Sequence, residues 1–466
     1  MKYVSTRGQA PVLSFDDVLL AGLARDGGLY VPETWPEFEP EEIRAFRDLD
    51  YPALAVQVML PFVGAAVTED ELAEIVAAAY AGFGHKAVAP LKQLGRNEWL
   101  MELFHGPTLA FKDYAMQFLG RMFDHVLGQR GQRVTVVGAT SGDTGSAAIE
   151  AFRDREAVDV FILHPKDRVS DVQRRQMTTV LSANVHNIAV EGSFDDCQDI
   201  VKGMFNDPAF RDDMGLAAVN SINWARIMSQ VVYYFWAGVA LGAPDRPIAF
   251  AVPTGNFGNV FAGYTARRMG LPVDGFVVGS NRNDILTRFF ESGEMTTRAV
   301  VPTLSPSMDI QISSNFERLL FDIHGADGAE VARLMSDFRR DGTFSIAPGL
   351  LQETRELFRG FSSDDEETKR MIAQVYAETG EILDPHSAVG VAAARAGWAE
   401  PDVPMVILAT AHPAKFPAAV EEATGIRPGL PASLAGLFQR RERCDVLPND
   451  LAAVKAHVRA RSRWRN

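Results

Sequence analysis

The sequence predicts an α/β fold built on parallel sheets with helices on both faces. From about residue 95 onward, short apolar segments alternate with glycine-containing loops and helical patterns. The apolar segments are continuous rather than alternating with polar residues, which is typical of strands buried on both faces of a parallel sheet. Strands are expected at residues 134–137, 158–163, 188–190, 248–252, 276–278 and 405–408.

The first 92 residues are predicted to form a helical N-terminal domain. Ser14 is a capping residue before an apolar run, and residues 27–32 indicate a turn followed by a short strand. Helical patterns follow over residues 51–60, where Pro61 is expected to end the helix, and over residues 69–80.

Residues 93–440 are expected to form two αβα subdomains. The smaller one covers about residues 113–235, and the larger one takes the remainder. Residues 283–380 are more charged and more helical, so we predict an inserted helical segment there. Residues 441–466 are expected to be a C-terminal tail, in which the short basic stretch 457–465 favours a frayed helix over a binding arm.

The composition argues against several classes of protein. The 466 residues include 60 acidic and 46 basic side chains, a formal charge of -14, so neither nucleic acid nor an anionic membrane is an expected partner. Cys197 and Cys444 lie far apart, and neither a disulfide framework nor a metal site is predicted. The sequence has no apolar signal core at its start and no run of eighteen apolar residues, which favours a soluble cytoplasmic protein.

Lys112 is the first candidate catalytic residue. It follows the apolar triplet Leu109-Ala110-Phe111 and begins a helical pattern whose apolar residues repeat on one face. Burial would disfavour the ammonium form of this lysine, and a neutral amine can form a Schiff base with an aldehyde, including that of pyridoxal phosphate (PLP). A surface lysine in the first turn of a helix is the alternative.

Two loops have the composition of anion-binding sites. Residues 138–145 join an expected strand to a helix, and their glycines, Ser141 and Thr144 can donate to a carboxylate or phosphate. Asp143 adds a negative charge to this loop. Its side chain is therefore expected to cap backbone N–H groups or to contact a protonated partner. Residues 253–259 form a second nest that fits a phosphate monoester. Ordinary glycine-rich turns remain the alternative for both loops.

A third stretch, residues 405–416, ends a buried strand in the hydroxyl of Thr410. Ligands bind at the carboxyl ends of strands in α/β sheets, so Thr410 is a candidate contact. His386 and His412 are interpreted as hydrogen-bonded structural imidazoles.

Together these stretches occur in one order: residues 105–108 with 111–113, then 141–145, 255–259 and 410–416. In this order they resemble the threonine synthases, and more narrowly the longer bacterial and fungal type. Residues 3–8 and 26–32 fit the same type, and the resemblance extends to about residue 417.

The resemblance implies a tryptophan-synthase-β-like PLP enzyme of fold type II. Lys112 would be the Schiff-base lysine, and Thr410 would face the pyridine nitrogen of the cofactor. Asp143 stands near the phenolic oxygen, where many relatives outside the threonine synthases have Asn, and its detailed role stays open. The cofactor phosphate would be held by Gly255, Asn256, Phe257, Gly258 and Asn259, and the substrate carboxylate by Ser141, Gly142 and Thr144.

The reaction implied by the resemblance converts O-phospho-L-homoserine and water to L-threonine and phosphate, with Lys112 as general base at Cα. The leaving phosphate needs cationic contacts. Arg226 and Lys415 are the candidates, and both are equally consistent with structural or surface charges. Because it is neutral, Thr410 implies a weaker electron sink than an aspartate there would give.

Other functions are weighed against this one. A serine or threonine dehydratase-like PLP lyase has a related fold, and a non-catalytic PLP-binding relative is expected to have lost the lysine or a loop. A nucleotide-binding protein is disfavoured because neither a Walker nor a Rossmann fingerprint is present. The expected assembly is a monomer or a homodimer.

Overall fold

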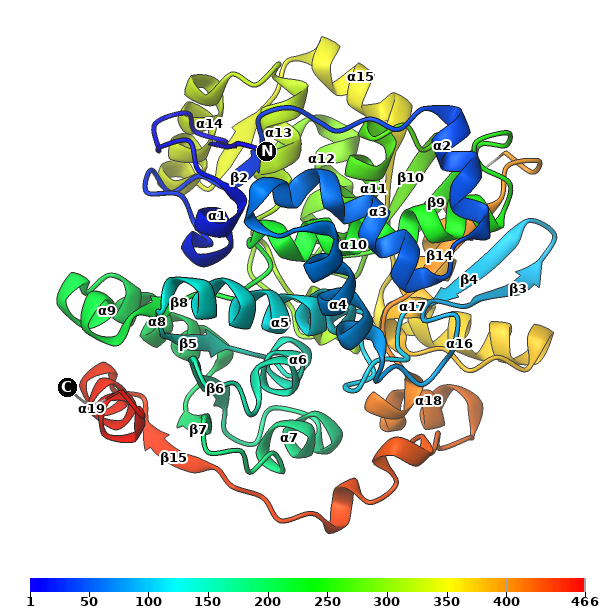
Figure 1. Ribbon diagram of the computed structural model, residues 1–466. Coiled ribbons are helices and arrows are strands. Elements are labelled where there is room, and N and C mark those ends of the chain that lie inside the picture. Colours follow the sequence, from blue (N-terminus) through cyan, green and yellow to red (C-terminus); the bar gives the residue numbers. More distant parts are fainter. Residues whose placement is uncertain (399, 465–466) are drawn as a thin grey trace.

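The computed structural model describes residues 1–398 and 400–464, and two sheets form the frame of the molecule (Figure 1). One sheet has six strands and the other has five, and all but one of their strand pairs are parallel. The predicted α/β fold with two parallel sheets is therefore confirmed. Within the described residues, no helix combines the length and apolar character needed to cross a membrane.

The six-stranded sheet is the frame of the larger subdomain. Its strands are β3 (Leu91–Gly95), β4 (Glu98–Glu102), β9 (Ile248–Pro253), β10 (Val273–Ser280), β13 (Phe358–Ser362) and β14 (Met405–Ala409), in the order β13-β10-β9-β14-β4-β3. Only β3 is antiparallel to its neighbour. On β14, Ile407 packs into one hydrophobic cluster with residues of α17 (Pro385–Gly397), whereas Val406 belongs to the main core on the other face. Burial on both faces explains the continuous apolar sequence of these strands.

The five-stranded sheet is the frame of the smaller subdomain. It consists of β5 (Val134–Ala139), β6 (Val158–Pro165), β7 (Val185–Glu191), β8 (Leu216–Ala217) and β15 (Asp445–Pro448), in the order β15-β7-β6-β5-β8. The helices of this subdomain are α5 (Lys112–Arg130), α6 (Asp143–Phe152), α7 (Asp171–Thr178), α8 (Phe194–Phe205) and α9 (Pro208–Met214).

The N-terminal residues form a small antiparallel pair and four helices. The elements are β1 (Tyr3–Ser5), α1 (Phe15–Ala21), β2 (Tyr30–Pro32), α2 (Pro40–Ala45), α3 (Tyr51–Val63) and α4 (Glu69–Tyr80). The expected helix end at Pro61 is wrong, because α3 continues to Val63. Pro61 stands in the last turn and removes one helical hydrogen bond, and the burial of Phe62 and Val63 offsets this loss.

The segment predicted as an insertion is mostly helical, but it also contributes to the large sheet. Its elements are α12 (Ile285–Ser292), β11 (Glu294–Thr296), α13 (Phe316–Ile323), α14 (Gly328–Asp341), β12 (Thr343–Ser345), α15 (Pro348–Leu357), β13 and α16 (Asp365–Thr379). β13 pairs with β10 as the edge strand of the six-stranded sheet. Two further helices, α10 (Trp224–Ala240) and α11 (Gly258–Arg268), pack against each other.

The C-terminal residues return to the smaller subdomain. After α18 (Pro417–Thr424) the chain crosses to the five-stranded sheet, where β15 pairs with β7 and α19 (Leu451–Arg461) follows (Figure 1). The expectation of a frayed helix over residues 457–465 is therefore wrong as far as residue 461, where α19 ends, since Val454 and Val458 are fully buried. Arg463 pairs with the buried Asp159 at 2.5 Å. Arg465, part of the expected basic stretch, lies outside the described residues.

Candidate active site

The site is built at the carboxyl ends of the central strands of the large sheet. The chain leaves β4, makes the loop that contains residues 105–111, and begins α5 at Lys112. The N–H of Phe111 donates to the carbonyl of Thr410 at 2.9 Å, directly after β14. This bond brings Lys112 and Thr410 together although nearly 300 residues separate them in the sequence.

The amine of Lys112 lies in a nearly closed environment. Its side chain is 12% exposed, and its Nζ stands 3.8 Å from Oδ2 of Asp143. Loss of hydration lowers the pKa of Lys112 to about 8, an effect that Asp143 opposes and that the cations Arg226 and Lys415 increase. The direction predicted from the sequence is therefore the one found, and about a tenth of this amine is neutral at pH 7.

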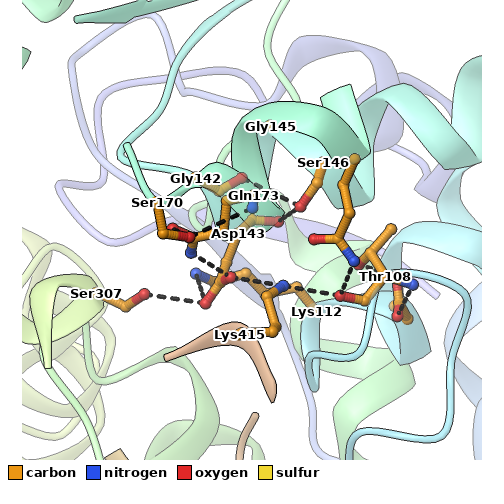
Figure 2. A network of polar contacts seen from close by, with 12 residues as sticks. Thr108, Lys112, Gly142, Asp143, Gly145, Ser146, Ser170, Gln173, Ser307 and Lys415 are labelled. Atoms are coloured by element: carbon orange, nitrogen blue, oxygen red, sulfur yellow. Dashed lines mark hydrogen bonds and ion pairs between the residues drawn. The ribbon is translucent and has the colours of Figure 1, made fainter. Parts of the chain in front are cut away.

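Asp143 is the centre of the polar network in Figure 2. Its Oδ1 accepts from Nε2 of Gln173 at 2.7 Å and from Nζ of Lys415 at 2.7 Å. Its Oδ2 accepts from Oγ of Ser307 at 3.1 Å. Burial favours the neutral acid, but Lys415, Lys112 and His386 together hold the pKa of Asp143 far below its usual range. Asp143 is thus an ionised carboxylate with donors from both subdomains.

Hydrogen bonds within the loop that carries Asp143 stabilise its conformation. Oγ of Thr140 accepts from the N–H groups of Gly142 and Gly145, both at 2.9 Å. Gly142 has φ +140°, and a Cβ there would lie 2.4 Å from the Gln173 side chain, so only glycine allows this approach. Ser141 and Thr144, the predicted carboxylate ligands, are partly exposed at the start of α6.

The second loop enters α11 through Phe257, whose φ of +60° is left-handed. A Cβ on Gly255 would lie 2.9 Å from Ile310, so the loop is closely covered by the segment after α12. The side chain of Asn259 is buried, and its Oδ1 accepts from the hydroxyl of Tyr233 at 2.6 Å. Its Nδ2 has no partner among the described residues.

A second unpartnered donor is buried on α10, the helix that packs against α11. Arg226 on α10 is 3% exposed; its Nη1 donates to the carbonyl of Val219 at 3.3 Å, but its Nε has no partner among the described residues. Buried donors are normally satisfied, so the free groups of Arg226 and Asn259 indicate an anionic ligand. A glycine nest, the free Nδ2 of Asn259 and a desolvated lysine fit the phosphate and the aldehyde of PLP, and the free Nε of Arg226 is left for a second anion.

The remaining predicted residues have internal partners. His386 pairs through Nδ1 with Asp384 at 2.7 Å, and its Nε2 accepts from the N–H of Ser307. His412 accepts from the N–H of Ala414, and burial lowers its pKa to about 4. Both contacts agree with structural imidazoles. Lys415 is fully buried rather than at the surface, and its ammonium already has two partners, Asp143 and the carbonyl of Thr108.

Sequence reasoning missed Gln173 and Ser307. Gln173 is in the first turn of a short charged helix, and Ser307 lies in the sequence Leu304-Ser305-Pro306-Ser307, which is typical of any turn. Nothing local indicates that either side chain meets Asp143, because these contacts span 30 and 164 residues. Only coordinates or residue covariation could have identified them.

Comparisons with known proteins agree with this geometry. Family models match the chain as "Threonine synthase N terminus" over residues 2–80, "Pyridoxal-phosphate dependent enzyme" over residues 85–411 and "Threonine synthase, C-terminal" over residues 387–458. A threonine synthase of Pseudomonas aeruginosa is 59% identical over 459 residues, covering 98% of each chain. The chain belongs to the threonine synthase family.

Solved threonine synthase structures have the same fold. A PLP-bound threonine synthase from Brucella melitensis is 56% identical, with a TM-score of 0.97 and full coverage of both chains. The yeast threonine synthase is 37% identical, with a TM-score of 0.93, and covers 99% of this chain and 98% of its own. The predicted family, the PLP fold type II and the cofactor are therefore confirmed, and this threonine synthase family member is a PLP-dependent enzyme.

Proposed function

We propose that the chain converts O-phospho-L-homoserine and water to L-threonine and phosphate, with Lys112 as the reactive amine. The observation that carries this proposal is the position of Lys112: a desolvated amine 3.8 Å from the ionised carboxylate of the first anion-binding loop. When bound, PLP supplies an aldehyde that captures amines and a ring that delocalises negative charge from Cα.

Lys112 has two tasks in this proposal. It anchors the cofactor, and once the substrate amine has taken its place it removes the proton from Cα and later returns it. A pKa of about 8 suits both tasks, because the amine is a better nucleophile when neutral and is basic enough to accept a proton. Thr410 would face the ring nitrogen of the cofactor, where its neutral hydroxyl would allow that nitrogen to stay unprotonated.

The two loops divide the anionic groups between them. Gly255, Asn256, Phe257, Gly258 and Asn259 hold the cofactor phosphate through backbone N–H groups, the start of α11 and the free Nδ2 of Asn259. The α6 end of the first loop receives the substrate carboxylate, with Ser141 and Thr144 as donors; Gly142 shapes the loop, because its N–H already donates to Thr140. Asp143 lies between them and faces Lys112.

The leaving phosphate is assigned to Arg226. Its guanidinium is buried, has a free Nε, and has its pKa lowered to about 10 by burial, so an anion at this place would restore its lost solvation. Lys415 is not assigned to this phosphate, because Asp143 and Thr108 occupy its ammonium.

Purified holoenzyme tests the reaction directly. The expected result is release of inorganic phosphate from O-phospho-L-homoserine in equal amount to L-threonine, and no oxo-acid from threonine or serine at comparable rates. Oxo-acid formation without phosphate release would instead support the dehydratase-like alternative. A cytoplasmic location, no nucleic-acid partner and a monomeric or homodimeric state stay predictions.

A further inference from the structure

Lys415 is a buried cation next to the reactive lysine. It follows β14 in a short 3₁₀ turn, Pro413–Lys415, and it is fully buried. Its Nζ lies 2.7 Å from Oδ1 of Asp143 and donates to the carbonyl of Thr108 at 2.7 Å. A fully buried ammonium is costly unless it is paired and hydrogen-bonded, so the place of this lysine requires an explanation beyond packing.

The two oxygens of Asp143 serve different partners. Oδ1 is occupied by Lys415 and Gln173, whereas Oδ2 faces Lys112 at 3.8 Å and accepts from Ser307 (Figure 2). The nearer cation is therefore Lys415, by more than 1 Å. Because Coulomb attraction weakens with distance, Asp143 interacts more strongly with Lys415 than with Lys112.

Lys112 would behave differently without this neighbour. A single buried carboxylate next to a single buried ammonium stabilises the charged form of both, as in any ion pair. Lys112 would then stay protonated to higher pH and be a poor nucleophile. With Lys415 present, its positive charge disfavours a proton on Lys112 and so offsets part of the attraction that Asp143 exerts on that proton.

We propose that Lys415 is a positioning residue that compensates the charge of Asp143 and so keeps the amine of Lys112 available in its neutral, reactive form. The inference rests on the role proposed for Lys112. The same side chain ties down the loop before α5, because Thr108, whose carbonyl it binds, also donates its N–H and hydroxyl to the buried Asp113. Lys415 therefore affects Lys112 both through its charge and through its hydrogen bond to the loop that precedes Lys112.

The charged groups around this pair come from several elements. Lys112 is influenced by Asp143 on α6, Arg226 on α10 and Lys415 after β14. Asp143 is influenced by Lys415, Lys112 and His386. Burial raises the pKa of Asp113, the neighbour of Lys112 on α5, to about 6. Hydrogen bonds from Thr108 and the positive charge of Lys415 oppose this rise. The pKa of about 8 for Lys112 is the balance between its burial and the charges that surround it.

Competitive acetylation of cofactor-free enzyme measures the neutral fraction of Lys112 without any turnover. The rate of reaction with acetic anhydride is followed at each pH by the mass of the peptide of residues 97–121, which contains Lys112 as its one lysine. In the parent protein we expect a midpoint near pH 8. Lys415→Met should raise the midpoint, and Asp143→Asn should lower it, each by about one unit or more.

Two further variants separate charge from packing. Lys415→Arg keeps the positive charge and should leave the midpoint near that of the parent. The double variant Asp143→Asn/Lys415→Met removes both charges and should return the midpoint toward the parent value, even where the single variants are less stable. A purely structural role of Lys415 would change acetylation rates without moving the midpoints in opposite directions.

The outcomes decide the proposal independently of the overall reaction. An unchanged midpoint in Lys415→Met, or a shift in the same direction for both single variants, would overturn it. If Lys415→Met fails to fold, a midpoint in Asp143→Asn that is equal to or higher than the parent value would overturn it as well. A parent enzyme that shows the expected titration but releases no phosphate from O-phospho-L-homoserine would contradict the proposed function and leave the charge relationship standing.

Discussion

The Gly255–Asn259 loop and the network around Asp143 lie at the same site but are constructed in opposite ways. The loop is five consecutive residues that offer backbone donors and one free amide. The Asp143 network gathers Lys112, Gln173, Ser307 and Lys415 from positions up to about 300 residues apart. The loop can donate hydrogen bonds to an anionic ligand. The Asp143 network instead pairs a carboxylate with ammonium groups of the same chain.

This difference separates binding from reactivity. A neutral nest with free donors gains most when a phosphate arrives, because its buried donors are then satisfied. A network whose charges are compensated before any ligand binds needs no reorganisation at the moment of reaction, which is how fixed charges contribute most to catalysis. Variants in the two regions should therefore fail in different ways: loss of affinity in the first and loss of rate in the second.

The largest effect is expected for Lys112→Ala. Removal of the amine eliminates both the anchor and the base, so kcat for phosphate release should fall at least about 1000-fold. Lys166→Ala is the matched control, because Lys166 is an exposed lysine paired with Glu191, and it should leave kcat unchanged. Residual activity within tenfold of the parent in Lys112→Ala would contradict the assignment. Steady-state phosphate assays measure both.

A smaller effect is expected for Arg226→Met. The free guanidinium is assigned to the leaving phosphate, so kcat/KM for O-phospho-L-homoserine should fall about 100-fold. Stability without substrate should not fall, since the variant removes a buried cation that has no carboxylate partner among the described residues. Thermal unfolding and kinetics together test this combination, with Arg121→Met, at a partly buried arginine whose side chain donates to Gln117, as control. Unchanged kinetics would return Arg226 to a structural role.

The Gly255–Asn259 loop is tested by the variant Asn259→Ala. This variant removes the free Nδ2 and one of the two acceptors of each hydroxyl of Tyr233 and Tyr234, so affinity for PLP should fall about 10-fold. At saturating PLP, kcat should recover most of its value. Titration of cofactor-free enzyme with PLP measures the change, and Asn206→Ala at the end of α8 is the control. A loss of kcat that excess PLP does not repair would show that Asn259 also serves the reaction.

The smallest effect on activity is expected far from both regions, at the C-terminus. Arg463→Ala leaves the buried carboxylate of Asp159 without its cation and should lower the free energy of unfolding by about 3 kcal/mol. PLP affinity and kcat should stay at parental values. Denaturant unfolding monitored by fluorescence, beside activity assays, checks both statements. An equal loss of activity would mean that the variants near the site also act through general destabilisation.

Features built from contiguous residues could be predicted from the sequence, whereas contacts between residues far apart in the sequence could not. The strand at β14, the loop before α11 and the burial of Lys112 follow from runs of apolar residues and glycines that are contiguous in the chain. The edge strand β15 was missed because four residues with only two apolar side chains give no strand signal. The contacts of Ser307 and Lys415 with Asp143 depend on how the two subdomains meet, which no local pattern encodes.

The most direct test of the account is to identify the lysine that carries the cofactor. Holoenzyme reduced with borohydride and digested with trypsin should carry the reduced cofactor on the peptide of residues 97–121, with cleavage blocked at Lys112. The visible absorption band of the bound cofactor should disappear in the same step. Attachment to Lys415, or no attachment at all, would contradict the assignment of Lys112 on which the proposed chemistry depends.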